Sequence, residues 1–157
     1  MTDIVDPAKR SRLMASIRGK NTKPELKVRR GLHQLGVRFR LHRRDLPGSP
    51  DLVFPKYQAT LFVHGCFWHR HESCRLAYTP STNSHKWVEK FDSNVERDRR
   101  QIALLQQGGW RVFVIWECAL RAKDSSDLLV AVAAELRTGK STYREWPTTS
   151  NQPQGPV

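Results

Sequence analysis

The stretch LPGSPDLVFPKYQATLFV, residues 46–63, predicts the kind of fold. It opens with the turn sequence LPGSP and continues with two short apolar runs, DLVF and ATLFV, which PKYQ separates. Two apolar runs joined by a short linker predict an antiparallel β-hairpin. Asp51 follows the turn directly and stands at the start of the first strand. A carboxylate in this position is a common way to hold a hard cation such as Mg²⁺ near a phosphate.

The segments around the hairpin predict a mixed α/β fold. They are a helix over residues 23–35, a strand over 37–41, a helix over 85–107, a strand over 110–117 and a helix within 124–139. Thr22 and Glu25 form a capping box at the start of the first helix. Asp98 is the polar exception in the apolar stripe of the 85–107 helix. Three strands in succession, then a helix and a strand, predict a small mixed sheet flanked by helices.

Length and charge predict one folded domain with a basic arm. The 157 residues suit a single hydrophobic core. The formal charge is +12, and residues 1–50 carry +9 of it, which favours nucleic acid as a partner over a role in solubility alone. We expect residues 1–20 to form a basic arm that becomes ordered against the partner, residues 21–140 to form the folded domain, and residues 141–157 to form a disordered tail.

The hydropathy and the cysteine count indicate a cytoplasmic protein, associated with the nucleoid if it binds DNA. No apolar run approaches the roughly 18 residues of a membrane span, so no membrane association is expected. The N-terminus lacks the apolar segment of a secretory signal. An odd number of cysteines in a reducing compartment argues against a disulfide framework.

Cysteine and histidine spacing predicts a zinc site. Cys66, His71 and Cys74 lie at the spacing C-x4-H-x2-C, and Cys118 stands at the end of the predicted 110–117 strand. Together they would make a Cys3His set, which is known for structural zinc, because thiolates favour zinc over magnesium. The alternative is that Cys118 is a small buried residue and that Cys66 and Cys74 are spare thiols.

Residues after the hairpin are candidates for catalysis. A Pro-Asp pair before a hairpin is similar to the opening signature of the PD-(D/E)XK nuclease superfamily, which has Glu-x-Lys on the next strand. Here that strand reads LFVHG and carries His64 instead. His64 and His69 are candidates for activating water, because imidazole titrates near physiological pH; alternatively, they are extra zinc ligands. Val63 can offer a main-chain carbonyl oxygen to Mg²⁺ beside Asp51.

Three aromatic residues near these histidines have two interpretations. Phe67 and Trp68 are adjacent, and Trp87 begins the 85–107 helix. They are either wedges that enter a DNA base stack or caps on the hydrophobic core. The sequence NVERDRR, residues 94–100, likewise reads either as a solvated helix face or as a set of groups that contact bases and phosphates.

Taken together, the chain resembles the very short patch repair (Vsr) mismatch endonucleases. The resemblance is carried by LPGSPD, HGCFWHRH, NVERDRR and GWRVFVIWECAL, and it extends from about Asp6 to Leu120. It implies a PD-(D/E)XK-like fold with a structural zinc site. It also implies a Mg²⁺-dependent nick in one DNA strand, 5′ to the thymine of a T:G mismatch that arises when 5-methylcytosine deaminates.

The resemblance also implies a role for individual residues. Asp51 and the Val63 carbonyl would hold Mg²⁺, His69 would be the general base, and His64 with Glu25 would orient water and phosphate. The zinc ligands would be Cys66, His71, Cys74 and Cys118. DNA would be contacted by the intercalating Phe67, Trp68 and Trp87, by Lys90 and Asn94, and by the arm with Met14 and Ile17. Two departures are Val63, where the family has a hydroxyl residue, and one additional residue before Cys74.

Two other functions fit parts of the sequence. A non-catalytic, zinc-stabilised DNA-binding module would not need Asp51, His64 and His69. A general PD-(D/E)XK nuclease of the restriction type would not need the wedge aromatics. As partners we expect double-stranded DNA with a T:G mismatch and mismatch-repair factors of the MutL type, and we expect the protein to be a monomer.

Overall fold

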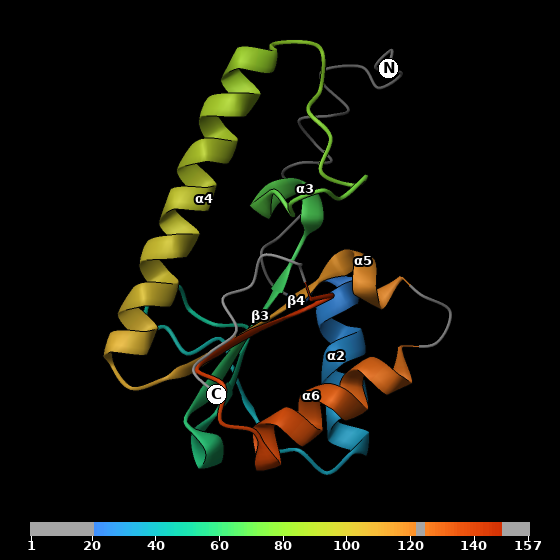
Figure 1. Cartoon of the computed structure of the whole chain (residues 1–157), viewed down its shortest axis with the longest axis vertical. Helices are drawn as coiled ribbons and strands as arrows, with labels where there is room; N and C mark the ends of the chain where they lie inside the picture. The colour runs from blue at the N-terminus through green and yellow to red at the C-terminus, as the bar shows by residue number, and fades with distance from the viewer. Residues whose placement is uncertain (1–20, 122–124, 149–157) are drawn as a thin grey trace.

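A computed structural model describes residues 21–121 and 125–148. The predicted basic arm, with Met14 and Ile17, lies outside these residues. Within them, one sheet has the strand order β1-β2-β3-β4-β5 (Figure 1). The strands are β1 Arg40–Leu41, β2 Leu52–Phe54, β3 Ala59–His64, β4 Arg111–Trp116 and β5 Tyr143–Trp146. The pairs β1–β2 and β2–β3 are antiparallel, whereas β3–β4 and β4–β5 are parallel, so the sheet is mixed as predicted.

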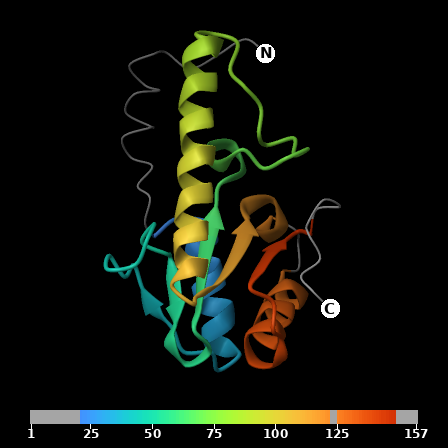
Figure 2. The ribbon, with the colours of Figure 1, turned by 60° about the vertical axis from the view of Figure 1, so that its left-hand side comes forward.

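Helices cover both faces of the sheet. The longer ones are α2 Lys23–Gln34, α4 Ser84–Gln107 and α6 Ser126–Thr138. Short helical segments are η1 Pro55–Tyr57, α3 Cys66–His69 and α5 Glu117–Leu120. Figures 1 and 2 show α4 on one side of the sheet and α2 with α6 on the other. The N-terminal half of α4 extends past the sheet and lies next to α3 (Figure 1).

Alternating strand residues build the two halves of the core. Leu61 and Phe113 face the α2 and α6 side, where they pack with Leu32 and Val132. Their strand neighbours face the α4 side; Phe62 packs there with Val112, Val114 and Leu105. Because successive side chains of a strand point to opposite faces, the apolar runs predicted as strands serve both halves.

The parallel pairing of β3 and β4 brings together the two segments that carry the candidate zinc ligands. His64 pairs with Trp116 at the ends of these strands. Cys66 and Cys118 each follow two residues later, in α3 and α5. Residues more than fifty positions apart in sequence therefore lie at one edge of the sheet.

Most predicted elements are confirmed, with shifted ends. The hairpin 51–63 forms β2 and β3, and the three predicted helices form at α2, α4 and α6. The strand predicted over 37–41 is reduced to Arg40–Leu41. No described helix is long and apolar enough to span a membrane.

Two segments differ from the prediction. Residues 66–69, which lie outside every predicted helix and strand, form the helical turn α3. The tail expected from residue 141 contains β5, so the folded part continues past residue 140. The physical reason is that β5 pairs with β4 along Val112–Ile115 and buries Trp146 against the sheet. A four-residue edge strand with this composition has no clear periodic signal in sequence.

Candidate active site and metal centre

A cavity of about 670 Å³ lies beside the C-terminal end of β3. The residues that line it include Asp51, Val63, His64, His69, Asp98 and Arg97. Asp51 immediately precedes β2, His69 ends α3, and Asp98 comes from the middle of α4. The cavity thus brings together Asp51, Val63, His64 and His69, which were predicted from sequence to bind Mg²⁺ or to act in catalysis. It also contains Asp98.

Asp51 is a buried carboxyl group held by the neighbouring strand. The Val63 N–H donates a hydrogen bond of 2.7 Å to its Oδ2. The pKa of Asp51 is raised to about 7, mainly by burial; the hydrogen bond from Val63 and the charge of Arg29 lower it, and the charge of Glu25 raises it. The N–H and C=O of one strand residue point to the same side of the strand, so the Val63 carbonyl faces Asp51. A carboxylate beside a carbonyl oxygen is a ligand pair suited to Mg²⁺.

Glu25 lies beside Asp51 and is almost completely buried. Only 1% of its surface is exposed, and it accepts hydrogen bonds from the Asn21 N–H at 2.9 Å and from the Arg29 guanidinium. His42 Nε2 lies 2.8 Å from its Oε1. The possible ligand atoms of Glu25, His42 and Asp51 all lie within 4.8 Å of one another. This second carboxylate adds negative charge beside Asp51, which favours a bound cation.

Glu25 also contributes to the start of α2, as the capping box predicted. The Thr22 Oγ1 accepts a hydrogen bond of 3.3 Å from the Glu25 N–H. The reciprocal bond from the carboxylate reaches the N–H of Asn21 and not that of Thr22. The structural role and the position beside Asp51 therefore coexist in one residue.

His64 and His69 form a stacked pair. Their ring centres are 3.9 Å apart and the ring planes differ by 4°. Burial, with smaller contributions from His69 and Arg97, holds the pKa of His64 well below its usual range, so its ring is neutral at neutral pH. His64 Nδ1 is buried and has no hydrogen-bond partner among the described residues.

Asp98 orients the second ring of this pair. Its Oδ2 lies 2.6 Å from His69 Nδ1. A carboxylate at Nδ1 favours the tautomer with the proton on Nδ1, which leaves Nε2 free to accept a proton. A neutral base with its acceptor nitrogen free is what activation of water requires.

The Cys3His set predicted from sequence comes together at the edge of the sheet. The ligand atoms of Cys66, His71, Cys74 and Cys118 lie within 4.8 Å of one another. His71 Nδ1 is 3.7 Å from Cys66 Sγ and 3.4 Å from Cys118 Sγ. Burial raises the pKa of the Cys66 and Cys118 thiols, so their thiolates need a cation to be stable. The donor set fits a closed tetrahedral zinc site.

His64 and His69 belong to a different group from the four zinc candidates. The group that contains them is completed by Asp98. The additional residue before Cys74 is accommodated in a turn, in which the Cys74 N–H donates to the His71 carbonyl and Ser73 has a φ of +57°. The chain turns within this loop, and the four candidate ligands still converge.

Trp116 connects the metal centre with the histidine pair and with β5. The His71 ring stacks on the Trp116 ring at 4.3 Å and 10°. The edge of the same tryptophan meets His64, with ring centres 5.2 Å apart. Its Nε1–H donates to Glu145 Oε2 at 3.4 Å, and the Tyr143 O–H donates to the same oxygen at 2.8 Å. Strand β5 thus holds the side chain that separates the two sites.

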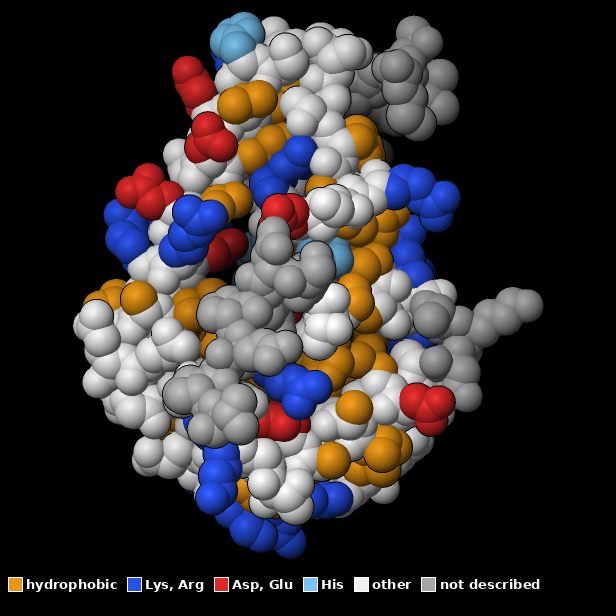
Figure 3. Space-filling view, in the orientation of Figure 1, with side chains coloured by type: hydrophobic (Ala, Val, Ile, Leu, Met, Phe, Trp, Pro, Cys, Tyr) orange, Lys and Arg blue, Asp and Glu red, His pale blue; other side chains and the backbone are white. Residues whose placement is uncertain are grey.

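An aromatic cluster lies on α3 and the start of α4. Phe67 is in ring contact with Trp68 at 5.0 Å, Trp87 at 5.6 Å and Phe91 at 5.1 Å. Phe91 is buried, whereas Phe67, Trp68 and Trp87 are only partly buried. Figure 3 shows hydrophobic side chains exposed among charged ones on the upper part of this face, where α3 and the N-terminal half of α4 lie. The three predicted wedges therefore sit at the surface on a buried aromatic base.

Lys90 and Asn94 both contact Trp68. The Lys90 ammonium lies 5.1 Å from the centre of the Trp68 ring, and Asn94 Nδ2 donates a hydrogen bond of 3.3 Å to the Trp68 carbonyl. These two residues, predicted as DNA contacts, are thus next to a predicted wedge. By contrast, Trp116 on β4 is buried.

Two of the cavity residues that could hold a metal or orient a base, Asp98 and His42, were not predicted as part of the site. Asp98 was noted only as the polar exception in an apolar stripe, and that exception is the signal that could have identified it. His42 had no such signal. It is placed by strand register, because its N–H donates to the Asp51 carbonyl at 3.4 Å.

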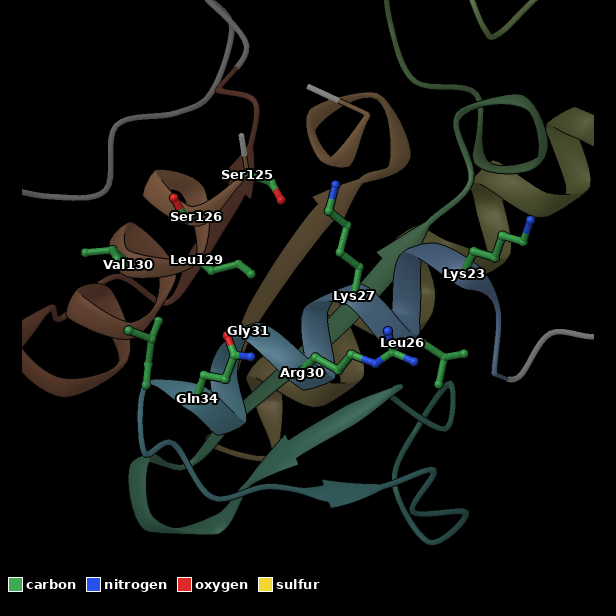
Figure 4. A pocket seen from close by; sticks show the side chains of 11 residues that line it. Lys23, Leu26, Lys27, Arg30, Gly31, Gln34, Ser125, Ser126, Leu129 and Val130 are labelled. Atoms are coloured by element: carbon green, nitrogen blue, oxygen red, sulfur yellow. The ribbon is translucent and has the colours of Figure 1, made fainter. Parts of the chain in front are cut away.

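A second cavity, about 600 Å³ in volume, lies between α2 and α6 (Figure 4). Lys23, Lys27 and Arg30 from α2 and Leu129 and Val130 from α6 are among the residues that line it. No carboxylate or imidazole occurs among its described lining residues, so it offers neither Mg²⁺ ligands nor a base. The cavity beside β3, which holds both carboxylates and imidazoles, is therefore the candidate active site.

The mixed sheet and its flanking helices place the protein in the restriction-endonuclease-like fold class, and the carboxylate–histidine cavity is its candidate active site. The fold is similar to that of the Homing Endonuclease I-Bth0305I Catalytic Domain, with a TM-score of 0.52, 19% identity, and coverage of 77% of this chain and 100% of that one.

Sequence comparison identifies the family. Residues 2–75 match the family described as DNA mismatch endonuclease Vsr. The chain is 45% identical to the DNA mismatch endonuclease Vsr of Escherichia coli strain K12, over 79% of each chain. It is 52% identical to the type II nicking enzyme V.XorIIP of Xanthomonas oryzae pv. oryzae, over 87% of this chain and 96% of the relative. The protein belongs to the DNA mismatch endonuclease Vsr family.

Proposed function

We propose that this protein is a Mg²⁺-dependent endonuclease that nicks one DNA strand 5′ to the thymine of a T:G mismatch and so starts very short patch repair. Family membership supports mismatch endonuclease activity. The observation that carries the proposal is the arrangement on α3: Phe67 and Trp68 project from the same helical turn as His69. Trp68, a candidate DNA-stacking residue, and His69, the candidate base, are therefore adjacent in one helical turn.

Asp51 and the Val63 carbonyl would hold the Mg²⁺ ion, with Glu25 adding negative charge nearby. The buried carboxyl of Asp51 gains most from a cation, because its ionised form is disfavoured without one. When bound, Mg²⁺ would neutralise charge that develops on the scissile phosphate.

His69 would take the proton from the attacking water at Nε2. Asp98 holds the ring through Nδ1 and would stabilise the imidazolium that forms. His64 stays neutral and, stacked on His69, would limit rotation of that ring and offer a hydrogen bond to water or phosphate. Each role is assigned to a group already in place in the free protein.

DNA would approach across α3 and the start of α4. Phe67, Trp68 and Trp87 would enter the base stack, which kinks the duplex at a cost of a few kcal/mol per step. Lys90 and Asn94 lie beside Trp68 and would then face the opened base pair. The arm over residues 1–20, with Met14 and Ile17, would grip the other groove.

The four-residue metal centre would hold structural Zn²⁺. It joins α3 to α5 and so fixes the helical turn that carries both the wedge and the base. We further propose a MutL-type mismatch-repair factor as protein partner, with the enzyme acting as a monomer in the cytoplasm.

Nicking of labelled duplexes in Mg²⁺ tests this function. The full-length protein should nick a T:G duplex, and Asp51→Ala should abolish nicking while the affinity for that duplex stays within about threefold. Retained nicking by Asp51→Ala would refute its role. A protein that binds but cleaves no duplex would be a DNA-binding module.

A further inference from the structure

We propose that Tyr78 is a fourth DNA-stacking aromatic side chain, and that Arg70 fixes the segment that presents it. The expected ligand of the Tyr78 ring is a nucleobase neighbouring the mismatched pair. This inference rests on the proposed function, because it extends the surface that the wedge residues present to DNA.

Tyr78 is an exposed aromatic residue at the edge of the cluster on α3. Its relative exposure is 55%, and it belongs to neither half of the hydrophobic core. Its ring centre is 5.2 Å from that of Phe67, with an angle of 55° between the planes. One side of the ring is therefore supported by Phe67, while much of its surface is open. An aromatic ring held in this way costs little to order when it stacks on a base.

Arg70 ties the backbone of Tyr78 to α3. Its Nη1 donates hydrogen bonds to the Tyr78 carbonyl at 2.9 Å and to the Phe67 carbonyl at 3.4 Å. Its Nη2 donates to Thr79 Oγ1 at 3.0 Å. One guanidinium therefore joins the residue that precedes Trp68 to the segment that follows the zinc loop.

The same guanidinium also lies on the buried base of the cluster. Its carbon is 4.0 Å from the centre of the Phe91 ring, at the distance of a cation–π contact. Arg70 caps α3 with a φ of +56°, which turns the chain there. Nη1 is directed at two carbonyls, Nη2 at the Thr79 hydroxyl, and the face of the guanidinium lies on Phe91. Arg70 therefore acts inside the protein, and we assign it a positioning role rather than a phosphate contact.

Affinity for DNA tests the part played by Tyr78. In the Asp51→Ala background, which separates binding from cleavage, Tyr78→Ala should weaken affinity for a T:G duplex about fivefold or more, the effect of losing one base stack. Tyr78→Phe should keep the affinity within about twofold, because the ring is retained. Val130→Ala is a matched control, since Val130 is 51% exposed but lies on α6.

A fluorescent base reports the contact itself. With 2-aminopurine beside the mismatch, binding of the Tyr78→Phe protein should quench the probe as the parent does, whereas Tyr78→Ala should leave it brighter. Equal affinity and equal fluorescence for Tyr78→Ala and its parent would overturn the proposal. Both readouts would still report stacking by Tyr78 if the protein bound T:G DNA without cleaving it. Failure of the nuclease function is therefore distinguishable from failure of this proposal.

Salt dependence separates positioning from direct contact for Arg70. Arg70→Ala should weaken binding, yet leave the slope of log affinity against log salt unchanged, because no phosphate contact is lost. The double variant Arg70→Ala/Tyr78→Ala should bind no more weakly than Tyr78→Ala alone. A slope reduced by about one, with multiplicative effects in the double variant, would show that Arg70 contacts phosphate and would overturn its positioning role.

Discussion

The contact between Asp98 and His69 determines how the candidate base is oriented. Asp98→Ala should lower the nicking rate roughly 10- to 100-fold, because the His69 ring loses the partner that fixes its tautomer. Affinity for the T:G duplex should change little, since Asp98 is directed at His69 and not at the surface cluster. Single-turnover nicking and a binding titration check both parts. An unchanged rate at every pH would show that His69 does not act through Asp98.

Asp51 makes the stability of the metal-free protein depend on pH. Its pKa in the folded protein, about 7, lies above its ordinary value of 3.8. Folding therefore favours the protonated carboxyl. The stability that the protonated carboxyl contributes is fully present below the ordinary pKa and is lost as the pH rises through about 7. The free energy of unfolding should fall over this range by an amount on the order of 4 kcal/mol at most.

Chemical denaturation at several pH values measures this fall. Asp51→Asn should reduce it, because the amide cannot ionise. Mg²⁺ should stabilise the protein more at about pH 8 than at about pH 5.5, since it binds the ionised carboxylate. Equal stabilisation by Mg²⁺ in the parent and in Asp51→Asn would place the ion elsewhere.

Helix α3 carries the proposed wedge residues and the proposed base within four residues. Trp68→Ala should lower affinity for the T:G duplex by about 1–3 kcal/mol and reduce the preference over matched DNA, because a stacking ring is lost. Trp68→Phe should retain most of both. Nicking at saturating protein should be affected less, since His69 and Asp98 remain in place. If affinity and preference were unchanged in Trp68→Ala, the ring would be a cap on the cluster and not a wedge.

Strand β5 supports the candidate zinc centre through Trp116. Glu145→Gln weakens the acceptor for Trp116 Nε1–H and Tyr143 O–H, so the ring stacked on His71 should become less fixed. Zinc release to a colorimetric chelator should then be about 10-fold faster or more. Glu117→Gln, a matched change of an acid on α5, should leave release unaffected. Identical release from the Glu145→Gln variant and the parent would show that β5 does not act on the metal centre.

At the level of the whole molecule, the sequence predicted the features that depend on residues close together in the chain. The hairpin, the capping box and the three long helices follow from turn residues, caps and periodicity within one segment. The convergence of the Cys3His cluster could be predicted because Cys118 was the one cysteine left to join Cys66 and Cys74.

What could not be predicted depends on contacts between distant segments. The pairing of β5 with β4 and the bond between Asp98 and His69 join residues about 30 positions apart. His42 reaches Glu25 only because strand register places it there. The sequence carries no signal for Arg70 and Tyr78, because their contacts join separate segments and leave no periodic pattern.

The central claim is that the cavity beside β3 and the aromatic cluster act together as a strand-specific mismatch nuclease. It is tested most directly by the nicking rate, in Mg²⁺, of two duplexes that differ only in a T:G or a C:G pair, with each strand labelled separately. We predict a single nick 5′ to the thymine, at least about 100-fold faster than any cut in the matched duplex. Equal rates on both duplexes, or cleavage of both strands, would contradict the claim.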